Sequence, residues 1–113
     1  MIKGAAADKS KAFAIRIINL YKYLQDKKEF VLSKQILRSG TSIGANITEA
    51  NYAQSKADFI SKMSIALKES AETAYWLELL AETKYITEEQ YSSINNDCQE
   101  LIRILTATVK NSK

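Results

Sequence analysis

Residues 35–50 hold the side chains whose types and spacing come nearest to a chemical site: an arginine, hydroxyls, an amide and a carboxylate. At 100° per residue of a helix, Arg38, Ser42 and Glu49 lie near one another, about 120° from an apolar stripe. Asn46 lies at the border between the two. Nucleophilic catalysis needs an activated nucleophile beside a tunable base, and these residues supply neither. We therefore expect a structural role for the segment, including a buried hydrogen bond from Asn46.

The same segment contains two glycines four residues apart, Gly40 and Gly44. A glycine within a helix costs about 1 kcal/mol relative to alanine, and close approach of another backbone can offset that cost. Glycine loops that bind phosphate follow a strand and precede a helix, whereas these two glycines fall inside an expected helix. We expect them to mark a helix contact and not a phosphate site.

The 113-residue chain contains no histidine and a single cysteine. These counts exclude Ser-His-Asp and Cys-His catalysis, histidine-ligated metal sites and a disulfide within one chain. The cysteine, Cys98, falls on the apolar seam of an expected helix, so we expect a buried and unreactive thiol. We accordingly expect no enzyme, no cofactor, no metal and no small-molecule substrate.

The second kind of chemistry that the residues offer is electrostatic. Residues 1–68 contain 12 Lys and Arg against 5 Asp and Glu, whereas residues 69–113 contain 4 against 8. Lysine and arginine side chains can neutralise phosphates. The candidates for nucleic-acid binding gather around the first expected helical hairpin and are Lys22, Lys27, Lys28, Lys34 and Arg38.

Two functional interpretations of this charge asymmetry stay open. In the first, the chain is a non-enzymatic oligomeric module that binds RNA or an RNA-associated protein through its basic half. In the second, it is a protein-only scaffold, in which the basic side of one subunit meets the acidic side of the next in a ring. An ordinary solvated surface would also carry such charges.

Four amphipathic segments separated by short polar breaks predict the helices that position these residues. The expected helices cover about residues 10–25, 31–51, 56–82 and 88–110. The expected core stripes are Ala14, Ile17, Ile18, Tyr21 and Leu24; Leu32, Ile36, Ile43, Ile47 and Ala50; Phe59, Met63, Ala66, Leu67, Ser70, Ala74, Leu77 and Ala81; and Tyr91, Ile94, Cys98, Leu101, Leu105 and Thr108. The absence of proline and the presence of only three glycines argue against a turn-rich β fold.

Two of the expected helices have clear starting signals. Ser55 with Asp58, and Thr87 with Gln90, have the spacing of capping boxes, in which each side chain satisfies a free backbone N–H. Long helices joined by short breaks run antiparallel to their neighbours. We expect an all-α fold, an antiparallel up-down-up-down four-helix bundle that forms one domain over residues 1–113.

The ends of the chain carry few signals. We expect disorder in residues 1–7 and 111–113. No stretch approaches the roughly 20 apolar residues of a membrane span, and none near the N-terminus is typical of a signal peptide. We therefore expect a cytoplasmic protein with no membrane partner.

Apolar residues on a second helix face indicate subunit contacts. Tyr75, Trp76 and Leu79 lie outside the core stripe of the third expected helix, so we expect them at an interface of a homo-oligomer. The alternative is that the aromatic pair closes the edge of the bundle. The first helix also has such residues: Ile15, Leu20 and Tyr23.

The run from Leu37 to Ala50 resembles the signature of a family of bacterial four-helix-bundle proteins encoded in intervening sequences of 23S ribosomal RNA genes. The matching positions are Arg38, Ser42, Ile43, Asn46, Ile47 and Glu49. Ala50 stands where the family usually has glycine, and residues 58–73 also resemble it. The resemblance implies antiparallel bundles that assemble into pentameric rings. It also implies kinship with accessory proteins of diversity-generating retroelements, which are basic pentamers that bind nucleic acid and a reverse transcriptase.

Overall fold

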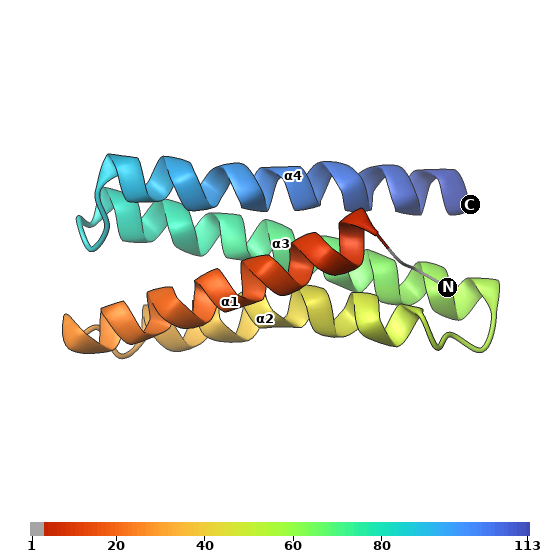
Figure 1. Cartoon of the computed structure of the whole chain (residues 1–113), viewed down its shortest axis with the longest axis horizontal. Helices are drawn as coiled ribbons and strands as arrows, with labels where there is room; N and C mark the ends of the chain where they lie inside the picture. The colour runs from red at the N-terminus through yellow and green to blue at the C-terminus, as the bar shows by residue number, and fades with distance from the viewer. Residues whose placement is uncertain (1–3) are drawn as a thin grey trace.

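The computed structural model describes residues 4–113, and this part of the chain forms four helices and no strand. The helices are α1 (Ala5–Asp26), α2 (Leu32–Ala50), α3 (Lys56–Glu82) and α4 (Glu88–Ser112). Successive helices run antiparallel and form an elongated bundle of 44 × 20 × 19 Å (Figure 1). The expected all-α four-helix bundle is confirmed. Within the described residues, no helix is both long and apolar enough to span a membrane.

The outer ends of the first and last helices extend further than expected. Ala5–Ala7, expected to be disordered, form the first turn of α1, and α4 continues to Ser112. Alanine has the highest helix propensity, and the Asp8 carboxylate in the first turn suits the positive end of the helix dipole. The expected disorder of residues 1–3 lies outside the described residues.

The start of α4 is a capping box, as expected. The hydroxyl oxygen of Thr87 accepts a hydrogen bond from the Gln90 amide at 3.1 Å, and the Thr87 amide donates to Oε1 of Gln90 at 2.8 Å. At the start of α3, Oγ of Ser55 accepts from the Asp58 amide at 3.1 Å. The Asp58 carboxylate, however, accepts from the amide of Gln54, one residue before the cap, so this second box is displaced by one residue.

The start of α2 is capped by Glu29, a residue that the sequence places in a polar break. One carboxylate oxygen of Glu29 accepts from the Ser33 amide at 2.6 Å. The other accepts from the amides of Leu32 at 3.1 Å and Val31 at 3.3 Å. The carboxylate is buried against the helix N-terminus, where a negative charge is favoured.

The turns after α1 and α3 lie at the same end of the bundle and have the same geometry (Figure 1). Lys28, just after α1, has φ 62°, and the next amide, that of Glu29, donates to the Leu24 carbonyl at 2.9 Å. Lys84 has φ 68° in the equivalent place after α3, and its following amide also donates five residues back at 2.9 Å. This is a Schellman motif, in which glycine usually occupies the left-handed position.

The core runs the length of the bundle and contains most of the expected stripes. Its largest fully buried side chains are Phe13, Ile17, Leu24, Ile36, Ile43, Ile47, Met63, Leu77, Leu80, Leu101, Leu105 and Thr73. The expected stripe of the first helix is partly wrong, because Ile18 is 39% exposed while Phe13 is 1% exposed. The first helix is apolar on more than one face, so the contact with its neighbours decides which face turns inward.

The position of α1 is set by α2. A Cβ atom at Gly40 would lie 2.7 Å from Cγ1 of Ile17, and one at Gly44 would lie 3.5 Å from the Ser10 carbonyl oxygen. The two glycines thus let α1 lean against α2, and α1 diverges from α4 toward its C-terminal end (Figure 1). The prediction that the glycines mark a helix contact is confirmed.

Candidate functional site

The polar residues of the α2 segment make local contacts. Nδ2 of Asn46 donates to the Ser42 carbonyl at 2.8 Å, and Oγ of Ser42 donates to the Arg38 carbonyl at 2.6 Å. The Glu49 carboxylate forms an ion pair with Lys62 of α3 at 3.4 Å. The expectation of a buried bond from Asn46 is wrong, because the side chain is half-buried and turns back onto its own helix.

A buried polar bond between α2 and α3 does exist, but it uses residues that sequence reasoning missed. Oγ1 of Thr73 is 2.8 Å from Oγ of Ser39, and both side chains are fully buried. Serine and threonine hydroxyls are accommodated within helices when they donate to a backbone carbonyl of the preceding turn. The Thr73 hydroxyl does so with the Glu69 carbonyl. Their spacing in the sequence carries no signal of the pairing.

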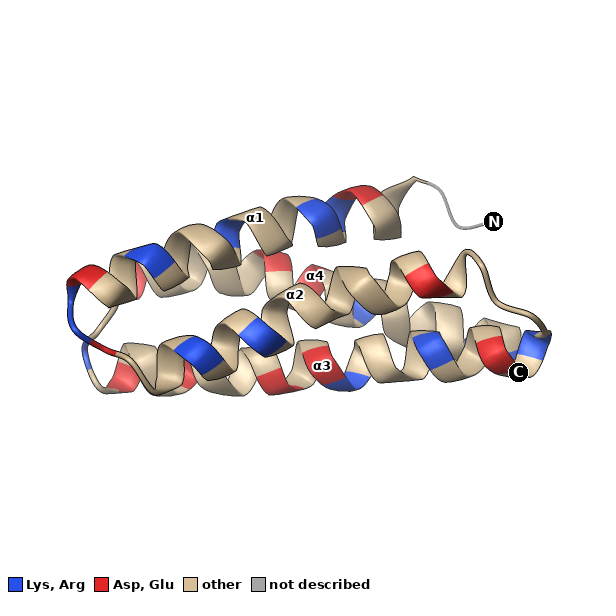
Figure 2. Ribbon diagram, turned by 90° about the horizontal axis from the view of Figure 1, so that it is seen from below, with Lys and Arg blue, Asp and Glu red and all other residues tan. Residues whose placement is uncertain are grey.

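The five candidate nucleic-acid-binding residues lie at one end of the α1–α2 hairpin. They are Lys22, Lys27, Lys28, Lys34 and Arg38, all exposed. Figure 2 shows basic residues at this end of α1 and α2, with acidic residues prominent along α3. None of the five forms an ion pair with a described residue, and Nζ of Lys27 lies 5.1 Å from the centre of the Tyr23 ring.

At this same end of the bundle, the side formed by α3 and α4 is acidic. Glu78 and Glu82 near the end of α3, and Glu88 and Glu89 at the start of α4, are exposed and form no ion pair within residues 4–113. Burial and then the carboxylates of Glu78 and Glu88 raise the pKa of Tyr91. One end of the bundle therefore carries positive charge on one pair of helices and negative charge on the other pair.

The three candidate interface residues on α3 differ in their surroundings. Tyr75 is 54% exposed, whereas Trp76 is half-buried against the core. Nε1 of Trp76 donates to the Glu72 carboxylate at 3.0 Å, and the two aromatic rings lie 5.3 Å apart. Leu79 is half-buried. Trp76 thus closes the edge of the bundle, while Tyr75 points away from the core.

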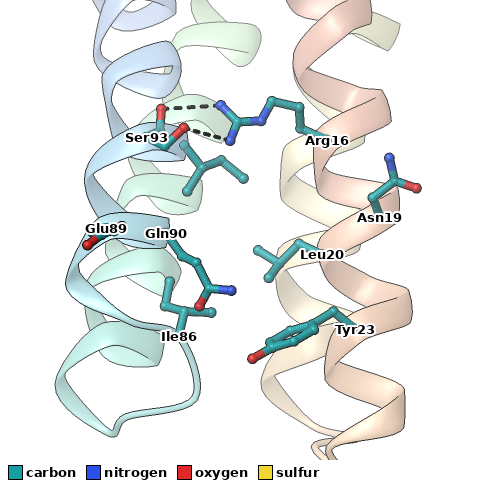
Figure 3. A pocket seen from close by; sticks show the side chains of 9 residues that line it. Arg16, Asn19, Leu20, Tyr23, Ile86, Glu89, Gln90 and Ser93 are labelled. Carbon is teal, nitrogen blue, oxygen red and sulfur yellow. Dashed lines mark hydrogen bonds between the residues drawn. The ribbon is translucent and has the colours of Figure 1, made fainter.

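A cleft of about 480 Å³ opens where α1 diverges from α4. Its lining residues are Arg16, Asn19, Leu20, Tyr23, Ile86, Glu89, Gln90, Ser93 and Ile94. Arg16 spans the gap and donates to Oγ of Ser93 at 2.9 Å and to the Ser93 carbonyl at 3.2 Å (Figure 3). It also donates to the Asp97 carboxylate at 2.8 Å. The sequence carries no signal for this cleft, because it depends on the tilt of α1.

The cysteine lies in the core, as expected. The Cys98 thiol is buried and bonds to the Ser70 carbonyl at 3.4 Å. Burial, and to a lesser degree the Asp97 carboxylate, raises the pKa of the Cys98 thiol to about 12. A neutral buried thiol is a poor nucleophile. Within the described residues, no group of three or more Cys, Asp and Glu side chains could hold a metal ion.

Residues 4–107 match the family model described as 23S rRNA-intervening sequence protein. The chain belongs to this family. It is also similar to a crystal structure from Bacteroides thetaiotaomicron, a protein of unknown function from the S23 ribosomal protein family, with 64% sequence identity and a TM-score of 0.92. The similarity covers 94% of this chain and 99% of that chain. No curated protein matches the chain. The family assignment agrees with the resemblance of residues 37–50, and nothing in these comparisons points to catalysis.

Proposed function

We propose that this 23S rRNA-intervening sequence protein is a non-enzymatic interaction module that binds RNA through the basic end of its α1–α2 hairpin. The observation that carries the proposal is that five exposed cations gather at this end of the hairpin, and none of them has a carboxylate partner in the described structure. Lys9, Arg16 and Lys62 are held in ion pairs, and the other unpaired cations of the described chain are spread over α3, α4, the turn after α3 and the first half of α1. Free cations remain available to neutralise phosphates and to release the counterions that surround RNA.

The test is a gel-shift titration of a structured RNA at about 50 mM and 200 mM salt, where phosphate contacts weaken steeply as salt rises. Changing Lys27, Lys28 and Lys34 together to Glu should abolish binding and leave the helices intact, because all three side chains are exposed. A matched triple change to Glu at Lys56, Lys68 and Lys110 alters the net charge equally at other exposed positions. Equal loss in both variants, or no binding by the unaltered protein at about 50 mM salt, contradicts the proposal.

A protein-only scaffold is the second candidate, and the acidic side of the same end favours it. Glu78, Glu82, Glu88 and Glu89 are free of ion pairs within residues 4–113, so the basic side of one copy could meet the acidic side of the next. In that case the Lys27, Lys28 and Lys34 variant should disrupt assembly in sedimentation, and RNA binding should be absent from the start. The family resemblance implies that such a ring has five subunits.

Exposed apolar residues on two helices support assembly with copies of the same chain. Ile15 and Ile18 lie on the outer face of α1, and Tyr75 lies on the outer face of α3. Because α1 and α3 each pack against α2 and α4, they occupy opposite corners of the bundle. Two different apolar faces on opposite sides suit a head-to-tail contact, which closes into a ring when the rotation between subunits permits it.

A further inference from the structure

The cleft between α1 and α4 has the size and the apolar floor of a small-molecule site. Leu20 and Tyr23 line it from α1, and Ile86 and Ile94 line it from the other wall. Small-molecule sites are concave, mostly apolar and about 300–1,000 Å³ in volume, and this cleft is about 480 Å³. On its other side α1 packs closely against the glycines of α2.

The polar groups that point into the cleft are hydrogen-bond donors. Oε1 of Gln90 accepts from the Thr87 amide at 2.8 Å in the capping box, which turns the Gln90 Nε2 group toward α1 (Figure 3). The Tyr23 hydroxyl points toward α4 in the same view. Neither Nε2 of Gln90 nor the Tyr23 hydroxyl has a hydrogen-bond partner among the described residues. Both groups are open to water, so a bound molecule with acceptor oxygens would take the place of water on these donors.

An unpaired cation lies beside Tyr23, at one end of the cleft. Nζ of Lys27 lies 5.1 Å from the centre of the Tyr23 ring and has no acidic partner in the described structure. The Arg16 guanidinium, at the other end, is neutralised by Asp97 at 2.8 Å. Glu89 is the only acid among the lining residues, and its carboxylate points away from α1 (Figure 3).

From this arrangement we propose that the α1–α4 cleft binds a small amphipathic anion, a molecule with an apolar body and a carboxylate or sulfonate group. The apolar body lies on Leu20, Ile86 and Ile94, and the anionic oxygens accept from Gln90 and Tyr23 beside the Lys27 ammonium. This site goes beyond the proposed RNA surface, and its occupancy requires neither RNA nor assembly.

The test uses 8-anilinonaphthalene-1-sulfonate as the probe, with its fluorescence followed in a titration of the folded protein. Octanoate and octylammonium then compete for the probe, because they share an apolar chain and differ in the sign of the head group. We expect saturable binding at one site per chain and displacement by octanoate only. A thermal melt of each sample shows that the probe does not report unfolding.

Gln90→Glu is the decisive variant, because glutamate serves equally well in a capping box and the fold is retained. It replaces the inward donor with a carboxylate, and we expect the affinity for the probe to fall about tenfold or more. Lys27→Met should also weaken binding of the probe. Gln35→Glu, at an exposed position of α2, changes the net charge by the same amount as Gln90→Glu and should leave the affinity unaltered. The proposal is overturned by the absence of saturable binding, by equal competition from octylammonium, or by unaltered affinity in Gln90→Glu.

Discussion

The Cβ position of Gly40 on α2 lies 2.7 Å from Cγ1 and 2.8 Å from Cγ2 of Ile17 on α1, closer than carbon atoms can approach. Isoleucine is branched at Cβ and has few rotamers within a helix, so Ile17 cannot turn aside. The absence of a side chain at Gly40 is therefore what brings the two helices together. The same helix α1 also forms one wall of the cleft with α4.

Gly40→Ala should destabilise the protein by about 1–2 kcal/mol, as overpacking outweighs the gain in helix propensity. Denaturant unfolding monitored by circular dichroism measures the change. Gly44→Ala is the matched control, because its Cβ would lie 3.4 Å from Oγ of Ser10 and fits. In an Ile17→Ala background the Gly40→Ala change should no longer destabilise. Equal stabilities of Gly40→Ala and the unaltered protein would show that α1 moves freely on α2.

Replacing Lys28 or Lys84 by glycine should stabilise the protein by about 1 kcal/mol each. Both lysines have φ between 60° and 70° at the end of a helix, where a side chain is strained and glycine is not. Lys28→Ala and Lys84→Ala keep the Cβ atom and remove the charge, so they should bring no such gain. Thermal melting of the glycine and alanine variants separates the relief of backbone strain from the loss of positive charge. If the alanine variants are as stable as the glycine variants, backbone strain at Lys28 and Lys84 is not the cause of the gain.

Features of the fold that depend on local spacing could be predicted from the sequence. The capping box of Thr87 and Gln90 involves residues three apart, so the sequence contains the whole interaction. The apolar seam of α4 is similarly regular, and Ile94, Leu101 and Leu105 are buried where the periodicity places them. These features require no knowledge of the neighbouring helices.

Features that depend on contacts between distant residues could not be predicted. Periodicity allows two faces of α1 to turn inward, and only the contacts with the neighbouring helices α2 and α4 select Phe13 over Ile18. The role of Glu29 requires the left-handed turn at Lys28, which aims its carboxylate at the start of α2. The α1–α4 cleft follows from the tilt of a whole helix, which no short sequence pattern encodes.

The Cys98 thiol predicts a specific dependence of stability on pH. Its pKa is raised to about 12 in the folded state, whereas an unfolded cysteine has a pKa of about 8.5. The unfolded chain therefore loses its thiol proton first as pH rises, and the stabilisation that exists below about pH 8.5 is lost progressively up to about pH 12. Between pH 8 and pH 10 this loss should be about 2 kcal/mol.

Urea unfolding of the protein and of Cys98→Ala at both pH values measures this contribution. The alanine variant lacks the thiol, so its free energy of unfolding should fall less between pH 8 and pH 10. Other groups that titrate in this range contribute equally to both proteins and cancel, except Tyr91, whose pKa Cys98 helps to raise in small part. Parallel pH profiles would mean that Cys98 does not remain neutral in the folded state.

Tyr75 offers the sharpest test of assembly, because it separates an interface from a bundle edge. Its side chain is 54% exposed, so Tyr75→Ala should leave the melting temperature nearly unaltered. If α3 contacts a second copy, the same change should lower the sedimentation coefficient at micromolar concentration, since aromatic residues dominate interface energies. Trp76→Ala is a less specific variant, because Trp76 also packs against the core and its loss should reduce stability as well.

Tyr52→Ala is the matched control for Tyr75→Ala. Tyr52 is 78% exposed in the turn after α2, outside the helices that carry Ile15 and Tyr75, so its replacement should change neither assembly nor the melting temperature. Ile15→Ser, on the outer face of α1, should weaken assembly as Tyr75→Ala does if the two faces meet head to tail. Mixing the two variants then gives a decisive result. Each variant retains one intact face. If the contact is head to tail, the intact α1 face of one variant binds the intact α3 face of the other, and the mixture forms a dimer that cannot grow further. If each face pairs with its own copy, mixing the variants should not restore assembly.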